Sequence, residues 1–140
     1  MTTPASINRR VVVGYDGLPG SSAALERAVE AAGEEGVVFV VHAHPSASGA
    51  DAAATVRALC GDTGGPLARI AWEPEIIAGD PAEAIAAVAV ARHADEIVVG
   101  TRRFGLARAL HGGVAEALIR TAGVPVTVVP RGVAPRAAAA

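Results

Sequence analysis

The sequence predicts a doubly wound α/β domain, in which a five-stranded parallel sheet carries helices on both faces. Short runs of Val and Ile alternate along the chain with segments whose apolar residues recur at helical spacing. These runs are apolar at every position, which is typical of parallel strands buried on both faces. The chain has 140 residues, of which 51% are hydrophobic and only 3% aromatic. A single core built from small aliphatic side chains is therefore expected.

The predicted strands cover residues 10–14, 37–41, 69–78, 96–100 and 124–129. The helix after the first strand has Ser21 or Ser22 as its N-cap and Gly33 as its C-terminal stop. Its sheet-facing side chains, which recur at helical spacing, are Leu25, Ala28, Val29 and Ala32. Residues 50–60 are expected to form a weaker helix with an Ala-rich face, and residues 61–66 a loop.

The helix that follows the third strand has the clearest start. Asp80 is its N-cap, Pro81 is its first helical residue, and Glu83 completes a pattern similar to a capping box. Its predicted sheet-facing residues are Ile85, Val88 and Ala89. The last helix is expected over residues 112–121, with Val114, Ala117 and Leu118 on one face.

Pro74 fixes the predicted order of the strands. A proline has no N–H to donate to a sheet ladder, so the strand that holds Pro74 is expected at an edge. Numbered by their appearance in the chain, the strands then lie side by side in the order 3-2-1-4-5. We expect residues 1–9 to be an N-terminal extension, residues 10–130 the domain, and residues 131–140 a flexible tail.

The composition narrows the classes of partner and location. The formal net charge is −2, which gives no electrostatic attraction to nucleic acid or to an anionic membrane. No apolar run approaches the roughly 20 residues that span a bilayer. Cys60 is the only cysteine, which suits a reducing compartment, so a cytoplasmic protein is expected. The chain has no lysine, which excludes Schiff-base chemistry and a P-loop.

Topology predicts where a ligand binds. In open parallel sheets, ligands bind beyond the carboxyl ends of the strands, where the winding reverses. In the predicted order this point lies between the first and fourth strands, so residues 14–20 and 100–113 form the walls of the crevice. Both segments are rich in glycine, and the second leads into a helix N-terminus, which favours anions.

Several motifs in a fixed order resemble the universal stress protein family. They are VVVGYDG over residues 11–17, VHA over 41–43, GDPAEAI over 79–85, DEIVVGTR over 95–102, GGVAEALIR over 112–120 and VPVTVV over 124–129. The resemblance covers nearly the whole chain. It implies an adenine nucleotide alpha hydrolase-like (Rossmann-like) fold and a stress-response binding or signalling module. It also implies ATP or another adenine nucleotide as ligand, with the need for Mg²⁺ left open.

The loop after the fourth strand departs from the G-x2-G-x9-G-[ST] motif of the ATP-binding members. Gly100 matches the first glycine, and Arg103 stands in place of the second. With Gly112 as the third glycine the loop is one residue short, whereas with Gly113 the hydroxyl residue is replaced by Val114. Arg102, Arg103 and Arg108 add positive charge that suits phosphate. The alternatives are nucleotide binding through this degenerate loop, or a dimeric interaction protein that has lost the site.

By this resemblance the nucleotide-binding residues are Gly14, Asp16, Gly17, Ala43, Gly100, Arg102, Arg103, Gly112, Gly113 and Val114. Asp16 and Ala43 are expected near the adenosine, and the residues of the fourth loop near the phosphates. An alternative for Asp16 is a purely local role, because Asp often stabilises the turn that it begins.

Other constellations give no catalytic or metal site. His42 and His44 share one side of an extended segment, but no third metal ligand accompanies them, so a structural role is expected. A triad of His111, Asp16 and Ser21 lacks a nucleophile elbow. We therefore expect no catalytic residues, and at most slow ATP hydrolysis. Glu73 and Glu75 flank Pro74, and the pattern indicates a solvated sheet edge rather than an acid–base pair.

The fifth strand is expected at the other edge of the sheet. It is strongly apolar, with Val124, Val126 and Val128 at alternate positions. An exposed apolar edge favours pairing with another chain, and the family resemblance implies the same strand. We therefore predict a homodimer with a sheet that continues across this strand, and a further protein partner of unknown identity.

Overall fold

The computed structural model describes residues 8–17, 19–44, 54, 58, 65–104 and 113–131. Its elements are β1 (Arg10–Gly14), α1 (Pro19–Ala32), β2 (Val37–His44), the 3-10 helix η2 (Pro66–Arg69), β3 (Ala71–Ala78), α3 (Pro81–Ala91), β4 (Glu96–Phe104), α5 (Val114–Thr121) and β5 (Val126–Arg131). The five strands are parallel and lie in the order β3-β2-β1-β4-β5. The predicted fold class and strand order are confirmed.

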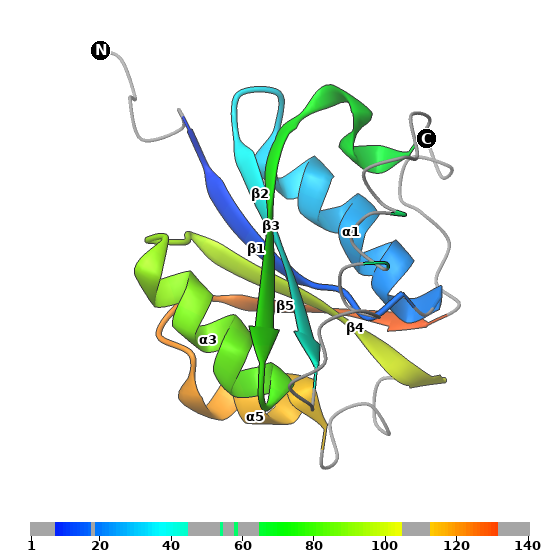
Figure 1. The fold of residues 1–140 in the computed structure, drawn as a ribbon, viewed down its shortest axis with the longest axis vertical. Coiled ribbons are helices and arrows are strands. Elements are labelled where there is room, and N and C mark those ends of the chain that lie inside the picture. The colour runs from blue at the N-terminus through cyan, green and yellow to red at the C-terminus, as the bar shows by residue number, and fades with distance from the viewer. Residues whose placement is uncertain are drawn as a thin grey trace.

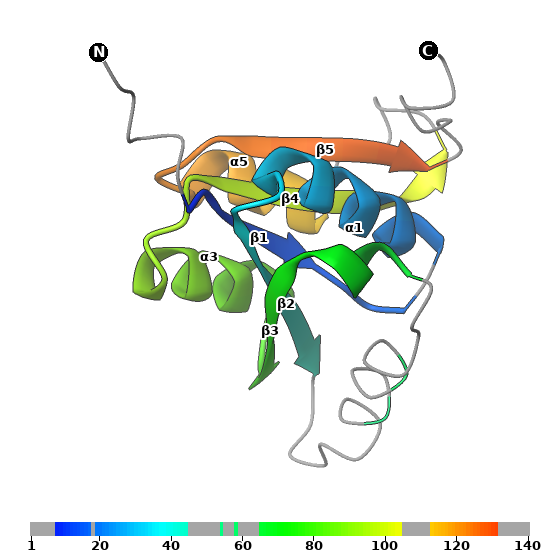
Figure 2. The same ribbon diagram turned by 90° about the horizontal axis from the view of Figure 1, so that it is seen from above.

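Two apolar clusters cover the two faces of the sheet, with α1 on one side of it and α3 and α5 on the other (Figure 1). Val11, Val13 and Val98 pack with α1 on one face. Val12 and Ile97, their neighbours along the same strands, pack with α3 and α5 on the other. Successive side chains of a strand point to opposite faces, so strands that are apolar throughout feed both clusters. Figure 2 shows β5 along one edge of the sheet and β3 along the other.

The edge position of β3 agrees with its proline. Pro74 pairs with Val40 of β2, and no described strand pairs with the other side of β3. Glu73 and Glu75 share the face toward α3, where Arg92 approaches their carboxylates at 3.7 and 3.0 Å. Hydrogen bonding to the Glu75 carboxylate, and then its negative charge, raise the pKa of the Arg92 guanidinium. These two glutamates are thus partners of one arginine and not an acid–base pair.

The helix boundaries confirm one predicted cap and correct two starts. The Asp80 carboxylate accepts a hydrogen bond from the Glu83 N–H at 3.0 Å, as expected of an N-cap. The prediction of Ser21 or Ser22 as the first cap is wrong, because α1 already begins at Pro19. Proline suits a first helical turn, where its missing N–H costs nothing. Helix α5 begins at Val114 with Gly113 as its N-cap, two residues later than predicted.

The strands differ from the predicted ranges mainly at their carboxyl ends. β2 continues to His44 because it pairs with β3 as far as Ala78, and β4 continues to Phe104. β3 and β5 begin two residues later than predicted, at Ala71 and Val126. Ladder pairing with a neighbouring strand decides these limits, and periodicity does not contain that information. The predicted helix over residues 50–60 lies outside the described residues, apart from Ala54 and Ala58.

A polar network ties the amino ends of three strands together. The buried Glu96 carboxylate accepts hydrogen bonds from Arg9 at 2.7 Å and from the Thr127 hydroxyl at 2.6 Å. Asp95 accepts a bond from the Arg10 N–H at 2.9 Å. These contacts join the start of β1 to β4 and β5. Within the residues that the structure describes, no helix is long and apolar enough to cross a membrane.

Candidate functional site

The carboxyl ends of β1 and β4 mark the switch point at which the sequence places a crevice. β1 pairs with β2 on one side and with β4 on the other, so the direction of winding reverses between β1 and β4. The described candidate residues at or following this end of the sheet are Gly14, Asp16, Gly17, Ala43, Gly100, Gly113 and Val114. Gly112, Arg108, His111 and the side chains of Arg102 and Arg103 lie outside the described part of the chain.

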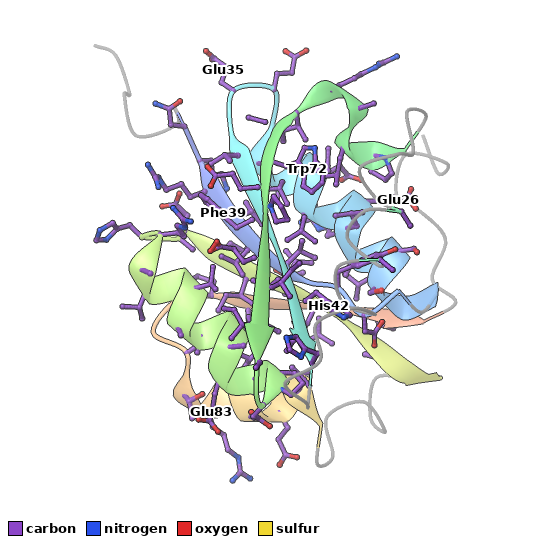
Figure 3. The ribbon with its side chains drawn as sticks, in the orientation of Figure 1. Glu26, Glu35, Phe39, His42, Trp72 and Glu83 are labelled. Atoms are coloured by element: carbon purple, nitrogen blue, oxygen red, sulfur yellow. The ribbon has the colours of Figure 1, made fainter. Side chains whose placement is uncertain are left out.

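The loop after β1 is held by main-chain and imidazole hydrogen bonds. The Tyr15 N–H donates to the Val41 carbonyl at 2.9 Å, and His42 Nδ1 lies 2.8 Å from the Tyr15 carbonyl oxygen. A carbonyl oxygen can only accept, so Nδ1 carries the proton and Nε2 is the acceptor of the neutral ring. Figure 3 shows His42 toward the carboxyl end of β2, at the opposite end of the sheet from Glu35.

This geometry gives His42 the structural role that the sequence predicted. Its Nδ1 is engaged by the main chain and anchors the β1–α1 loop to β2. Among the described residues, no group of three His, Cys, Asp or Glu side chains is placed to hold a metal ion.

Asp16 and Gly17 form a turn just beyond the carboxyl end of β1. Gly17 has a φ of 83°, in the left-handed region that glycine tolerates best. Asp16 directly precedes it and is partly buried. Asp16 therefore occupies a turn position, as the local interpretation requires, and also follows the carboxyl end of β1 at the switch point. Its carboxylate can only accept hydrogen bonds when ionised, so a ligand there must offer hydroxyl or N–H donors.

Gly14, Ala43 and Val114 make apolar contacts on the α3 side of the sheet. A Cβ placed on Gly14 would lie 2.7 Å from Ile85 Cδ1, so this glycine faces α3. Ala43 of β2 and Val114 of α5 both pack against the core cluster on the α3 side of the sheet. Gly14, Ala43 and Val114 thus supply shape and apolar surface rather than polar contacts.

Gly100 is explained by packing against α1. A Cβ on Gly100 would lie 2.6 Å from the carbonyl carbon of Gly20 and 3.3 Å from the Ser21 nitrogen. The Cβ direction of this glycine therefore points at the first turn of α1. The sequence assigned Gly100 to the phosphates through a motif, and gave Gly20 no role of its own. The only sequence signal for their contact was that both predicted loops contain glycine.

The N-terminus of α5 opens toward the same end of the sheet. Its cap, Gly113, is exposed and makes no side-chain hydrogen bond to the helix. The first N–H groups of a helix have no partner within it, and the helix dipole makes this end positive. The Ala117 N–H donates to the Gly113 carbonyl at 3.1 Å, which starts the intrahelical ladder. This end of α5 therefore suits an anion.

A hollow that the sequence did not indicate lies at the opposite end of the sheet. It has a volume of about 270 Å³ and lies between the carboxyl ends of α3 and α5. Its lining residues are Ala86, Ala89, Val90, His93, Ala94, Ile97, Thr121, Ala122, Gly123 and Val124. Its polar side chains are those of His93 and Thr121. The Thr121 hydroxyl donates a hydrogen bond to the Ala117 carbonyl at 2.8 Å. The hollow contains little that would select a ligand.

Comparison with known proteins decides the family. The sequence model of the universal stress protein family matches residues 8–59 and 66–130. The chain belongs to the universal stress protein family. This universal stress protein has the α/β fold of its structural neighbours, the adenine nucleotide alpha hydrolase-like fold, as the motifs predicted. No curated protein sequence matches it significantly.

Solved structures of similar chains agree with this assignment. A universal stress protein in complex with cAMP is 26% identical, with a TM-score of 0.73, and the match covers 90% of this chain and 99% of that one. A protein from Mycobacterium tuberculosis H37Rv is 28% identical, with a TM-score of 0.59 and coverage of 88% and 95%. A universal stress protein from Archaeoglobus fulgidus in complex with dAMP, 22% identical, shares the fold with a TM-score of 0.68 and coverage of 88% and 98%.

Proposed function

We propose that this universal stress protein is a stress-response signalling module that binds an adenine nucleotide between the β1–α1 loop and the start of α5. The observation that carries the proposal is that the topology brings three features to the same end of the sheet, at the switch point between β1 and β4. They are the Asp16–Gly17 turn, the apolar side chains of Ala43 and Val114, and the N-terminus of α5. Support also comes from the similar universal stress protein that was solved with cAMP.

Each feature matches one part of a nucleotide. The apolar side chains of Ala43 and Val114 suit a planar base, and the Asp16 carboxylate suits ribose hydroxyls, which donate hydrogen bonds. The positive end of the α5 dipole, with the arginines of the preceding loop, suits phosphate. The glycine cap contributes no hydroxyl, so fewer donors are available for a polyphosphate than the ATP motif provides. The role is ligand binding that shifts the population of loop conformations, with no catalytic residue assigned.

Calorimetric titration with AMP, cAMP and ATP, the last with and without Mg²⁺, tests this function. Asp16→Asn keeps a residue that forms the same turn but removes the negative charge. We expect it to weaken binding about tenfold, as loss of a charge-assisted hydrogen bond does. Glu35→Gln is the matched control, because it removes one exposed carboxylate at the far end of the sheet. Failure of all three nucleotides to bind at millimolar concentration would reject the proposal.

We also propose that the protein forms a homodimer through β5. The Ile97 N–H donates to the Pro125 carbonyl at 2.9 Å, and Ile97 is in register with Val126. Alternate residues of a strand direct their main-chain groups to opposite sides, so those of Val126 and Val128 face away from β4. These groups are available to a second copy of the strand. This dimer surface is the basis of the alternative function, an interaction protein that works without a nucleotide.

A cytoplasmic location completes the proposal. It rests on the single cysteine, Cys60, which offers no disulfide within the chain. Fractionation of cells that express the tagged protein tests it, and recovery outside the cytoplasmic fraction would contradict it.

A further inference from the structure

Gly20 and Gly100 lock the first turn of α1 onto β4. A Cβ on Gly20 would approach the Thr101 carbonyl oxygen closer than 3.0 Å, a distance that real Cβ atoms essentially never show. A Cβ on Gly100 would lie 2.6 Å from the Gly20 carbonyl carbon. In both cases the obstacle is backbone, which cannot rotate aside as a side chain can. Each glycine therefore occupies a place that only glycine fits.

This contact joins the start of α1 to the carboxyl end of β4, beside the switch point between β1 and β4. Gly20 is buried in the first turn of α1, three residues after Gly17 of the β1–α1 loop. Gly100 lies where β4 passes its last contact with the sheet neighbour Val129, before the register shift toward Phe104. The contact between Gly20 and Thr101 thus fixes how far the start of α1 stands from the carboxyl end of β4.

We infer that Gly20 and Gly100 are a positioning pair for the nucleotide site. The inference rests on the proposed function and deepens it. The Thr101 carbonyl occupies the space in which a Cβ of Gly20 would lie. Gly20 therefore acts on a ligand through the spacing of the loops. A methyl group there pushes the start of α1 away from β4 and separates the residues that must contact the nucleotide together.

The same geometry explains the glycine at position 100 without any ligand. This glycine is required by the approach of α1 whether or not a phosphate binds beside it. Gly100 would therefore persist in a relative that has lost its nucleotide.

The test compares three glycine-to-alanine variants. Gly20→Ala is the test variant. Gly36→Ala is the matched control, because its Cβ would meet the Ala32 carbonyl closer than 3.0 Å and the Arg9 carbonyl at 2.7 Å, at the opposite end of the sheet. Gly123→Ala is the neutral control, with no atom within 4 Å of its Cβ. Each variant is first shown to be folded, and the Kd for AMP, cAMP and ATP is then measured well below the lowest Tm.

We expect Gly20→Ala and Gly36→Ala to lower the Tm, and only Gly20→Ala to raise the Kd. The expected rise is about tenfold, the loss of roughly one well-placed hydrogen bond. An unchanged Kd for Gly20→Ala overturns the inference. An equal rise for Gly36→Ala also overturns it, because general loosening of the fold would then be the cause.

Hydrogen exchange separates this inference from the proposed function. In the wild-type protein, added nucleotide should slow amide exchange in the first turn of α1 as well as in the two loops. Slowing confined to the loops counts against the positioning pair. If the wild-type protein binds no nucleotide, the proposed function fails, and the pair is judged by exchange in the variants. Gly20→Ala should then speed amide exchange over residues 14–17 and 100–104. If Gly36→Ala speeds exchange over these residues equally, the inference that Gly20 and Gly100 are a positioning pair is wrong.

Discussion

Leu118 is expected to hold α5, and with it the proposed phosphate end of the crevice, in place. α5 has eight residues, fewer than the roughly 12–15 that an isolated helix needs to be even marginally stable. Its buried residues are Ala115 and Leu118, and Leu118 is 0% exposed. Truncation of a fully buried leucine to alanine costs about 3–5 kcal/mol in transfer and cavity terms. We take about 3 kcal/mol for Leu118→Ala, because a short helix near the surface can partly close the cavity.

The adjacent residue provides the control. Ile119 lies on the same helix but is 53% exposed, so Ile119→Ala should cost less than about 1 kcal/mol. For a chain of this length, 3 kcal/mol corresponds to a Tm lowered by about 10 °C. Urea unfolding gives both free energies, and exchange of the α5 amides reports whether the helix opens locally. Leu118→Ala and Ile119→Ala could instead lower the free energy of unfolding by amounts that agree within about 0.5 kcal/mol. That result would refute the argument that burial of Leu118 holds α5.

Three further predictions concern the cap of α3, the amino-end network and the β5 edge. Asp80→Ala removes the 3.0 Å bond to the Glu83 N–H and should cost about 1 kcal/mol, seen as a Tm about 3 °C lower; an unchanged Tm contradicts it. Glu96→Ala leaves the Thr127 hydroxyl without its carboxylate and should cost about 2 kcal/mol in urea unfolding, whereas wild-type stability would show that the network contributes nothing. Val128→Pro removes an outward N–H of β5, so sedimentation should show a weakened dimer, while Val128→Thr, which keeps that N–H, should leave it intact; a dimer that survives the proline excludes pairing through this strand.

Local chemistry in the sequence was enough to predict the fold. Pro74 cannot donate to a ladder, and this one missing N–H placed β3 at the edge and gave the strand order. Asp80 with Glu83 marked the start of α3 to the residue, because a cap and its partner are three positions apart in the chain. Apolar runs without alternation indicated strands buried on both faces, and both core clusters contain them.

For the candidate site, the sequence supplied a location to test but not the roles of the residues. Topology alone indicates the carboxyl ends of β1 and β4, and Asp16, Gly17 and Gly113 follow strands that end on that side of the sheet. The motif assigned Gly100 to phosphate, whereas in the structure a side chain at this position would collide with the backbone of α1. His42 was expected to be structural, and its bond to the Tyr15 carbonyl supplies the reason.

The sequence by itself determined which segments become strands and helices and how the strands are ordered, because periodicity, capping and a proline act over a few residues. Only the tertiary structure decided where the elements end and why particular glycines are needed. The extension of β2 to His44 depends on a partner strand more than 25 residues away in the chain. The contact between Gly20 and Thr101 joins backbones about 80 residues apart. Such contacts arise when separate segments pack, so no local pattern in either segment records them.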